Sequence, residues 1–104
     1  MKFTIEVTSF KRLDKGALVG FCDIKIRELR IKVHEVAVYA KNGSRWASMP
    51  AKPWFKDGVA VRGDSGKIQY TPLFEFETKV VRDAFGAAVW RALLDFDPNA
   101  AGAP

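Results

Sequence analysis

The chain has 104 residues, which is enough for one hydrophobic core and too short for two. Hydrophobic residues make up 48% of it and charged residues 28%, so the composition is that of a globular protein and excludes a disordered one. The net charge of +5 is unevenly spread, because residues 1–56 hold 12 basic and 5 acidic side chains while residues 57–104 hold 5 and 7. Such an excess favours a polyanionic partner, such as nucleic acid or an anionic membrane surface.

The few chemically special residues narrow the possible classes further. The single cysteine, Cys22, excludes an internal disulfide, and one cysteine with one histidine, His34, excludes an ordinary zinc site. We therefore expect no metal and no cofactor. No stretch approaches the roughly 20 apolar residues of a membrane helix, and no apolar signal core follows the charged, alternating first six residues. We expect a cytoplasmic protein that does not enter the membrane.

Three segments in the first forty residues alternate between apolar and polar side chains, which is typical of half-buried strands. We predict strands over residues 2–13, 17–27 and 31–40, with a turn at Asp14-Lys15-Gly16 after the first. Phe10 breaks the alternation of the first strand, which indicates a bulge near Ser9. The apolar residues of the third strand change parity after Val33, so a bulge near His34-Glu35 is needed to return them to the core face.

The middle of the chain carries strong turn signals. Asn42-Gly43 predicts a hairpin whose return strand covers residues 44–49 and closes at Pro50. Residues 50–66 are rich in proline, glycine, basic and aromatic residues, and we interpret them as a long loop with a short strand near Val59–Val61. Residues 67–77 alternate again around Pro72, which argues for an edge position or a strand end.

Residues 78–96 have helical periodicity, with Thr78 as the candidate N-cap. The tail over residues 97–104 contains a proline and small residues, and we predict that it is disordered. The chain is thus predicted to be a single α+β domain over residues 1–96, in which an antiparallel meander of four to five strands precedes one C-terminal helix.

The predicted helix is apolar on two sides. One face carries Val81, Phe85, Ala88, Val89, Ala92 and Phe96, and the opposite side carries Ala87, Trp90 and Leu94. We interpret this second side as a homodimer interface, because exposed apolar patches usually mark contacts. The alternative is a fold in which the sheet wraps around the helix.

Basic and aromatic side chains alternate between the predicted hairpin and the last strand. The basic members are Arg45, Lys52, Lys56, Arg62 and Lys67, and the aromatic members are Trp46, Trp54, Phe55 and Tyr70. Basic side chains neutralise phosphates and aromatic faces stack on unpaired bases, so this segment is a candidate nucleic-acid site. The alternative is that Trp46 and Phe55 belong to the core and the lysines are only solvated. A second basic set, Lys25, Arg27, Arg30 and Lys32, lies on one predicted sheet face, and we interpret it as a solvated surface.

The residues give little support for catalysis. Cys22 and His34 are the only pair of types suited to nucleophilic catalysis, and Cys22 shares its strand face with apolar residues. The phosphate-binding motifs GxGxxG and GxxxxGK[ST] are absent. We predict that the protein is not an enzyme and has no small-molecule substrate.

An ordered set of short motifs resembles the stage V sporulation protein G (SpoVG) family. The set comprises Ile5-Glu6-Val7-Thr8, Val33-His34-Glu35-Val36, Asn42-Gly43 and Met49-Pro50-Ala51-Lys52, with a looser match through Tyr70-Thr71-Pro72-Leu73 to the helix. The family comprises small, dimeric bacterial proteins with an antiparallel sheet and a C-terminal helix, which bind DNA and RNA as regulators linked to sporulation, septation and virulence genes. By this resemblance, Lys52 corresponds to a family lysine implicated in nucleic-acid binding, whereas Pro53 replaces the arginine that usually follows it.

Residues and resemblance together predict a small homodimeric regulator that binds DNA or RNA. Its phosphate contacts would come from Lys52, Lys56, Arg62 and Lys67 with Arg45 in support, and Trp54 would stack or wedge between bases. The alternative is a protein–protein interaction module that is not an enzyme and does not bind nucleic acid.

Overall fold

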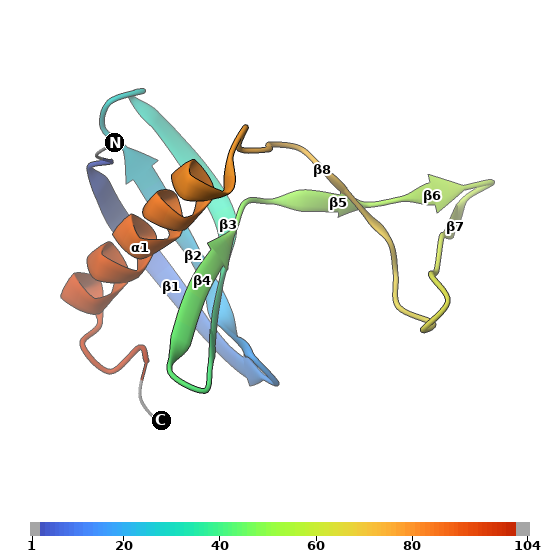
Figure 1. Cartoon of the computed structure of the whole chain (residues 1–104), viewed down its shortest axis with the longest axis horizontal. Helices are drawn as coiled ribbons and strands as arrows, with labels where there is room; N and C mark the ends of the chain where they lie inside the picture. The colour runs from blue at the N-terminus through green and yellow to red at the C-terminus, as the bar shows by residue number, and fades with distance from the viewer. Residues whose placement is uncertain (1–2, 102–104) are drawn as a thin grey trace.

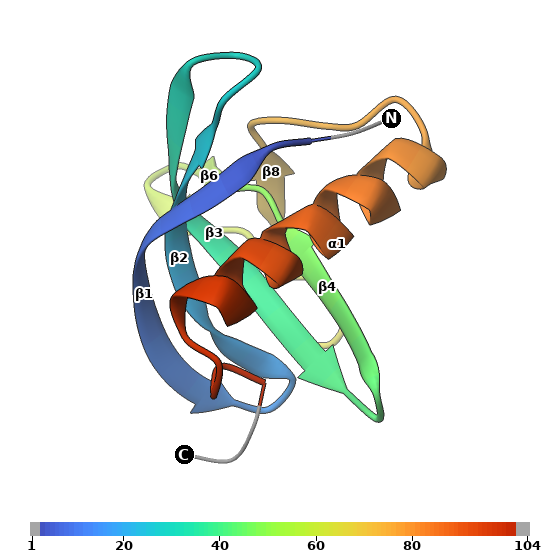
Figure 2. The same ribbon diagram turned by 90° about the vertical axis from the view of Figure 1, so that its left-hand side faces the viewer.

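A computed structural model describes residues 3–101 and shows a four-stranded antiparallel sheet with one helix across it (Figure 1). The strands lie in the order in which they occur in the chain, as a meander of β1 (Ile5–Lys15), β2 (Leu18–Ile26), β3 (Ile31–Lys41) and β4 (Ser44–Ser48). The helix α1 (Lys79–Phe96) crosses one face of this sheet diagonally (Figure 2). The predicted α+β class and the antiparallel meander with a C-terminal helix are therefore confirmed.

Both predicted bulges are present. The pairing of β1 with β2 shifts register between Val7 and Ser9, and the pairing of β2 with β3 shifts where His34 and Glu35 together oppose Asp23. Glu35 takes up the extra length with a φ of 60°, in the left-handed region. Val33 and Val36 consequently both face the core, although their sequence parity differs.

The turns follow the residues that favour them. Asn42 and Gly43 have φ values of 51° and 82°, and two positive φ values are what the favoured two-residue hairpin turn requires. Gly20 is required for space rather than for its φ angle, since a Cβ there would lie 2.9 Å from Cε1 of Phe10 and would overlap the carbonyl oxygen of Lys11. The aromatic ring of Phe10 thereby reaches the core from β1.

The core lies between the sheet and the helix. Its largest fully buried side chains are Phe85, Ile24, Leu93, Val36, Val38, Val89 and Cys22. The predicted N-cap is confirmed, because the Thr78 hydroxyl accepts a hydrogen bond from the amide of Val81 at 3.3 Å. No helix within residues 3–101 is long and apolar enough to cross a membrane.

The prediction of a disordered tail is wrong for the part that the structure describes. Ala100 is fully buried in the core, and Arg12 donates hydrogen bonds to the carbonyl oxygens of Asn99 and Ala100 at 2.7 and 2.9 Å. The small side chain that suggested disorder is the one that fits between the end of the helix and the sheet. The rest of the predicted tail, residues 102–104, lies outside the described residues.

Residues 51–72 form an arm that extends from the end of β4, on the side of the sheet opposite to the helix (Figure 1). Its strands are β5 (Ala51–Pro53), β6 (Phe55–Lys56), β7 (Val59–Ala60) and β8 (Tyr70–Pro72), with β5 paired to β8 and β6 to β7. The prediction of a long loop is corrected to an arm of two short two-stranded sheets, while the expected short strand appears as β7. The last strand ends at Pro72, as expected from a residue that lacks an amide hydrogen.

Candidate nucleic-acid interface

Backbone hydrogen bonds hold the arm together at its middle. The amide of Trp54 donates to the carbonyl of Gln69 at 2.8 Å, and the Trp54 carbonyl accepts from the amide of Val61 at 2.7 Å. The amide of Gln69 in turn donates to the carbonyl of Val61 at 2.7 Å. Three separate passes of the chain therefore meet at one point, which gives an ordered arm despite its prolines and glycines.

Large apolar side chains on the arm are exposed. Trp54 is 53% exposed, Phe55 58% and Val59 68%. The alternative that placed Phe55 in the core is wrong, because no part of the sheet or helix covers it. Such side chains stay exposed at a cost in free energy that a bound partner would offset.

The structure brings four of the predicted basic residues onto this arm. Lys52, Lys56, Arg62 and Lys67 are all exposed, and none of the ion pairs among residues 3–101 involves them. The guanidinium of Arg62 donates to the carbonyl of Gly66 at 2.8 Å, so Arg62 also stabilises the loop in which it lies. Their charges are therefore available to an anionic partner.

Arg45 is not part of this cluster. It lies beside the Asn42-Gly43 turn, at the end of β4 opposite to the arm (Figure 1). Its guanidinium lies 5.6 Å from the ring centroid of Trp90, in a cation–π contact. Sequence proximity to Trp46 suggested a shared site with the arm, but the length of β4 separates the two.

The second basic set comes together at the turn between β2 and β3. Lys25 and Lys32 are direct partners in the antiparallel register, and they line a shallow hollow of about 260 Å³ together with Arg27 and Arg30. The guanidinium of Arg27 pairs with Glu6 at 2.6 Å, which leaves Arg30 and the two opposed lysines as the remaining positive charge of the hollow. The predicted basic face therefore exists, at the edge of the outer surface of the sheet.

The expected dimer interface on the helix is not available as predicted. Trp90 is only 3% exposed, and its Nε1–H donates to the carbonyl of Trp46 at 2.9 Å. Leu94 is half-buried against the core and Ala87 is exposed. Of this second apolar side, Trp90 is covered by β4 of the same chain, so the alternative in which the sheet wraps the helix applies to Trp90. A homodimer remains a prediction that would need another surface.

Cys22 and His34 do not form a catalytic pair. Cys22 is 1% exposed and faces the core, and burial, with a smaller effect of the Asp23 charge, raises the pKa of its thiol to about 12. His34 lies on the opposite face of the sheet, where its Nδ1 is 3.2 Å from a carboxylate oxygen of Asp23. No cluster of potential metal ligands occurs within the described residues.

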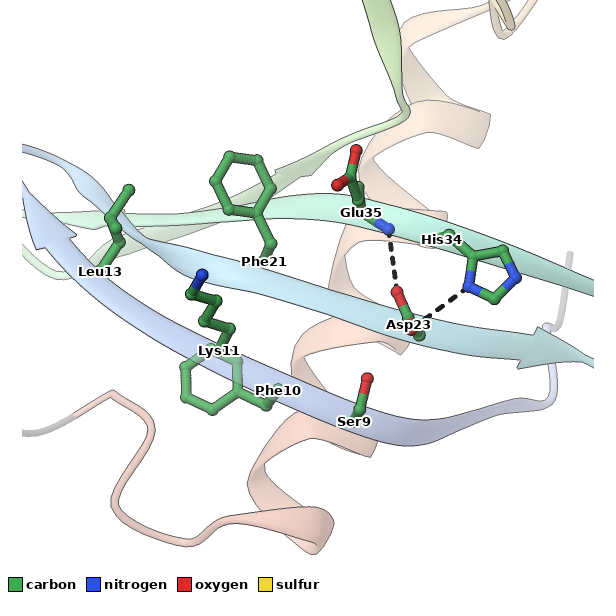
Figure 3. Close-up of a pocket in the computed structure, with 8 residues that line it drawn as sticks. All are labelled: Ser9, Phe10, Lys11, Leu13, Phe21, Asp23, His34 and Glu35. Atoms are coloured by element: carbon green, nitrogen blue, oxygen red, sulfur yellow. Dashed lines mark hydrogen bonds and ion pairs between the residues drawn. The ribbon is translucent and has the colours of Figure 1, made fainter.

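A hollow that no sequence pattern predicted lies on the outer face of the sheet (Figure 3). It measures about 610 Å³, and Lys11, Leu13, Phe21 and Glu35 project toward it from three neighbouring strands. At its floor, Asp23 accepts from the Glu35 amide and from His34, and these contacts lower the pKa of its carboxyl group. The one sequence feature that could have indicated this hollow is Phe21, an apolar residue on the outer face of β2, where the alternation predicts polar side chains.

Comparisons with known proteins identify no relative of this chain. No protein-family model matches the chain, and no curated protein and no solved structure is significantly similar to it.

Proposed function

We propose that this protein is a small nucleic-acid-binding regulator that uses its arm to contact DNA or RNA and acts as a homodimer. The observation that carries the proposal is Trp54, an indole that is 53% exposed and lies between β5 and β6, with Lys52 and Lys56 on either side of it in the chain. An indole that is exposed in this way adds little to the stability of the domain itself. A strand of nucleic acid offers phosphates to the lysines and a base to the indole.

The shape of the arm suits this role. The β6–β7 hairpin is two strands wide, which is narrow enough to enter the major groove of a duplex, and a single strand can follow the length of the arm. Lys52, Lys56, Arg62 and Lys67 would neutralise successive phosphates, and Trp54, with Phe55 beside it, would stack on or wedge between bases. Each phosphate neutralised releases counterions, so binding should weaken steeply as salt rises.

The test is a fluorescence-anisotropy titration of labelled single- and double-stranded DNA and RNA at two salt concentrations. The double variant K52A/K56A should bind more weakly and with a smaller salt dependence than the wild type. The control variant K15A/K41A loses the same charge from two exposed lysines at the far end of the sheet and should bind like the wild type. Trp54→Ala should lose about 1–3 kcal/mol if the indole stacks on a base.

Two results would contradict the proposal. If no nucleic acid binds at low salt, the function is wrong. If both double variants weaken binding equally, the attraction comes from net charge and the arm is not the contact surface.

One observation favours a second candidate, a protein-interaction module. Val59 and Phe55 have little to offer a phosphate backbone, yet they are among the most exposed apolar side chains on the arm. A partner protein would bury them, and its binding would show little salt dependence. The same titration separates the two functions, because this module would bind none of the oligonucleotides.

A further inference from the structure

A groove crosses the outer face of the sheet and reaches the base of the arm. It consists of two adjoining hollows, of about 610 and 440 Å³, which share Phe21 and Glu35 in their linings. The first lies over β1, β2 and β3 (Figure 3), and the second continues past Tyr39 to Tyr70 on the arm. A strand of nucleic acid bound along the arm could therefore continue onto the sheet.

The groove has aromatic walls. Tyr39 lines the second hollow, and its ring is stacked on that of Trp46 on the neighbouring strand, with ring centroids 5.4 Å apart and planes at 4°. Phe21 lies on the next strand and Tyr70 at the arm, where it is 59% exposed. Flat aromatic side chains on the surface of an antiparallel sheet are suited to stacking with unpaired bases.

Glu35 is held in place where the two hollows meet. Its amide donates to one carboxylate oxygen of Asp23 at 3.0 Å, while the other oxygen of Asp23 lies 3.2 Å from His34. Both ends of the bulge are thereby fixed, and Figure 3 shows the Glu35 carboxylate beside Phe21, directed away from the sheet. Among residues 3–101, no hydrogen bond or ion pair occupies this carboxylate.

Positive charge borders the groove. Lys11 lines the first hollow. Lys25 and Lys32 lie directly opposite each other, two residues along their strands from Asp23 and His34, and line the neighbouring hollow at the turn between β2 and β3. Like charges in direct opposition destabilise a sheet, and a bound phosphate would relieve that repulsion. The groove thus combines aromatic surfaces, one oriented acceptor group and flanking cations.

We propose that this groove binds an unpaired guanine of a single-stranded nucleic acid. The base stacks on Phe21 and Tyr39, the Glu35 carboxylate accepts hydrogen bonds from guanine N1–H and N2–H, and the lysines contact the neighbouring phosphates. The proposal rests on the proposed function and specifies which base and which strand form it recognises.

The choice of guanine follows from the chemistry of a carboxylate. Its two oxygens accept hydrogen bonds and donate none, so the best match is an edge with two adjacent donors. Guanine alone presents two neighbouring donors on its Watson–Crick edge. Adenine, cytosine and uracil or thymine each place an acceptor beside a donor, and this acceptor would face the negative charge. In a duplex this edge is occupied by pairing, which restricts binding to single strands.

The experiment compares three short labelled DNA strands by fluorescence anisotropy: oligothymidylate, the same strand with one central guanine, and the same strand with inosine in that place. The wild type should bind the guanine strand about 10-fold more tightly than oligothymidylate, a preference expected for a good bidentate contact. Inosine lacks the N2 amino group and should lose most of this preference.

The variants locate the effect. Glu35→Gln should abolish the guanine preference, because the amide places a donor opposite a donor. Glu77→Gln removes the same charge from an exposed residue outside the groove and should keep the preference. Phe21→Ala should weaken binding of all three strands through lost stacking, and circular dichroism confirms that each variant is folded.

The outcomes separate the two proposals. Equal binding of the three strands by the wild type overturns the guanine site and leaves the arm intact as the contact surface. A guanine preference that survives Glu35→Gln also overturns it. If no strand binds, the proposed function itself fails. If Phe21→Ala instead converts a dimer into a monomer, a second copy of the chain covers the groove and the guanine site is wrong.

Discussion

Replacing Trp90 by phenylalanine tests the central packing contact between the helix and β4. The indole is 3% exposed, and its hydrogen bond to the Trp46 carbonyl, at 2.9 Å, holds the helix to the last strand of the sheet. Phenylalanine keeps an aromatic ring beneath Arg45 but removes the donor, at a cost of about 1 kcal/mol. The missing ring atoms leave a gap that costs about 1–2 kcal/mol more. We expect a loss of about 2–3 kcal/mol in the free energy of unfolding.

The assay is urea unfolding followed by far-ultraviolet circular dichroism, at several protein concentrations because a dimer would make stability depend on concentration. With an m value of about 1–3 kcal/mol per molar, the midpoint should fall by about 0.7–3 M. The matched control is Trp54→Phe, the same substitution at an exposed position on the arm, which should change stability by less than about 0.5 kcal/mol.

Light scattering on the same samples supplies the refuting result. If Trp90→Phe lowers the molecular mass while the free energy of unfolding stays within about 0.5 kcal/mol of the wild type, Trp90 is an interface residue and its assignment to the core is wrong. If the two tryptophan variants lose equal stability, the assignment of Trp90 to the core is also wrong.

Four further predictions follow from other contacts. Cys22 should resist thiol reagents in the native protein and react after unfolding. Because its thiol pKa is raised from 9.0 to about 12, the stabilisation from the buried neutral thiol should be complete below pH 9.0 and lost as the pH rises toward about 12, and alkaline unfolding measures this loss. Thr78→Ala should lower the free energy of unfolding by about 1 kcal/mol in urea titrations, since the Val81 amide loses its acceptor. The lowered pKa of Asp23 stabilises the fold above pH 3.8 and less so as the pH falls below it, so Asp23→Asn should flatten the acid limb of the stability profile. Glu35→Gly should raise stability by about 0.5–1 kcal/mol, because relief of about 1–2 kcal/mol of left-handed strain exceeds the entropic cost of glycine.

The central sheet could be predicted because its information is local. Alternation fixes which side chains face the core, and a change of parity within one strand leaves a bulge as the simplest solution, as at His34-Glu35. The turn at Asn42-Gly43 needs two positive φ values, which these residues tolerate better than others. Thr78 likewise precedes the helical period directly and caps it.

The arm and the second side of the helix could not be predicted in this way. The pairing within the arm joins Trp54 to both Val61 and Gln69, and no short-range pattern reveals which distant backbone groups will meet. A helical period places Trp90 away from Phe85 but does not say that β4 will curve around to cover it. The outer groove could not be predicted for a related reason, because Phe21, Tyr39 and Tyr70 come from three elements that only tertiary folding brings together.

The bulge in β3 has two separable explanations. Its length is explained by folding, since one extra residue returns Val36 and Val38 to the core. Folding does not explain why the strained residue is a glutamate. A φ of 60° is easiest for glycine or asparagine, and Glu35 adopts it at a cost in free energy. Asp23 stabilises the strained residue through the Glu35 amide and leaves the Glu35 carboxylate unused. A strained, oriented and unpaired acceptor beside an aromatic side chain is the combination expected of a binding group, and this supports the proposal of a guanine site at Glu35.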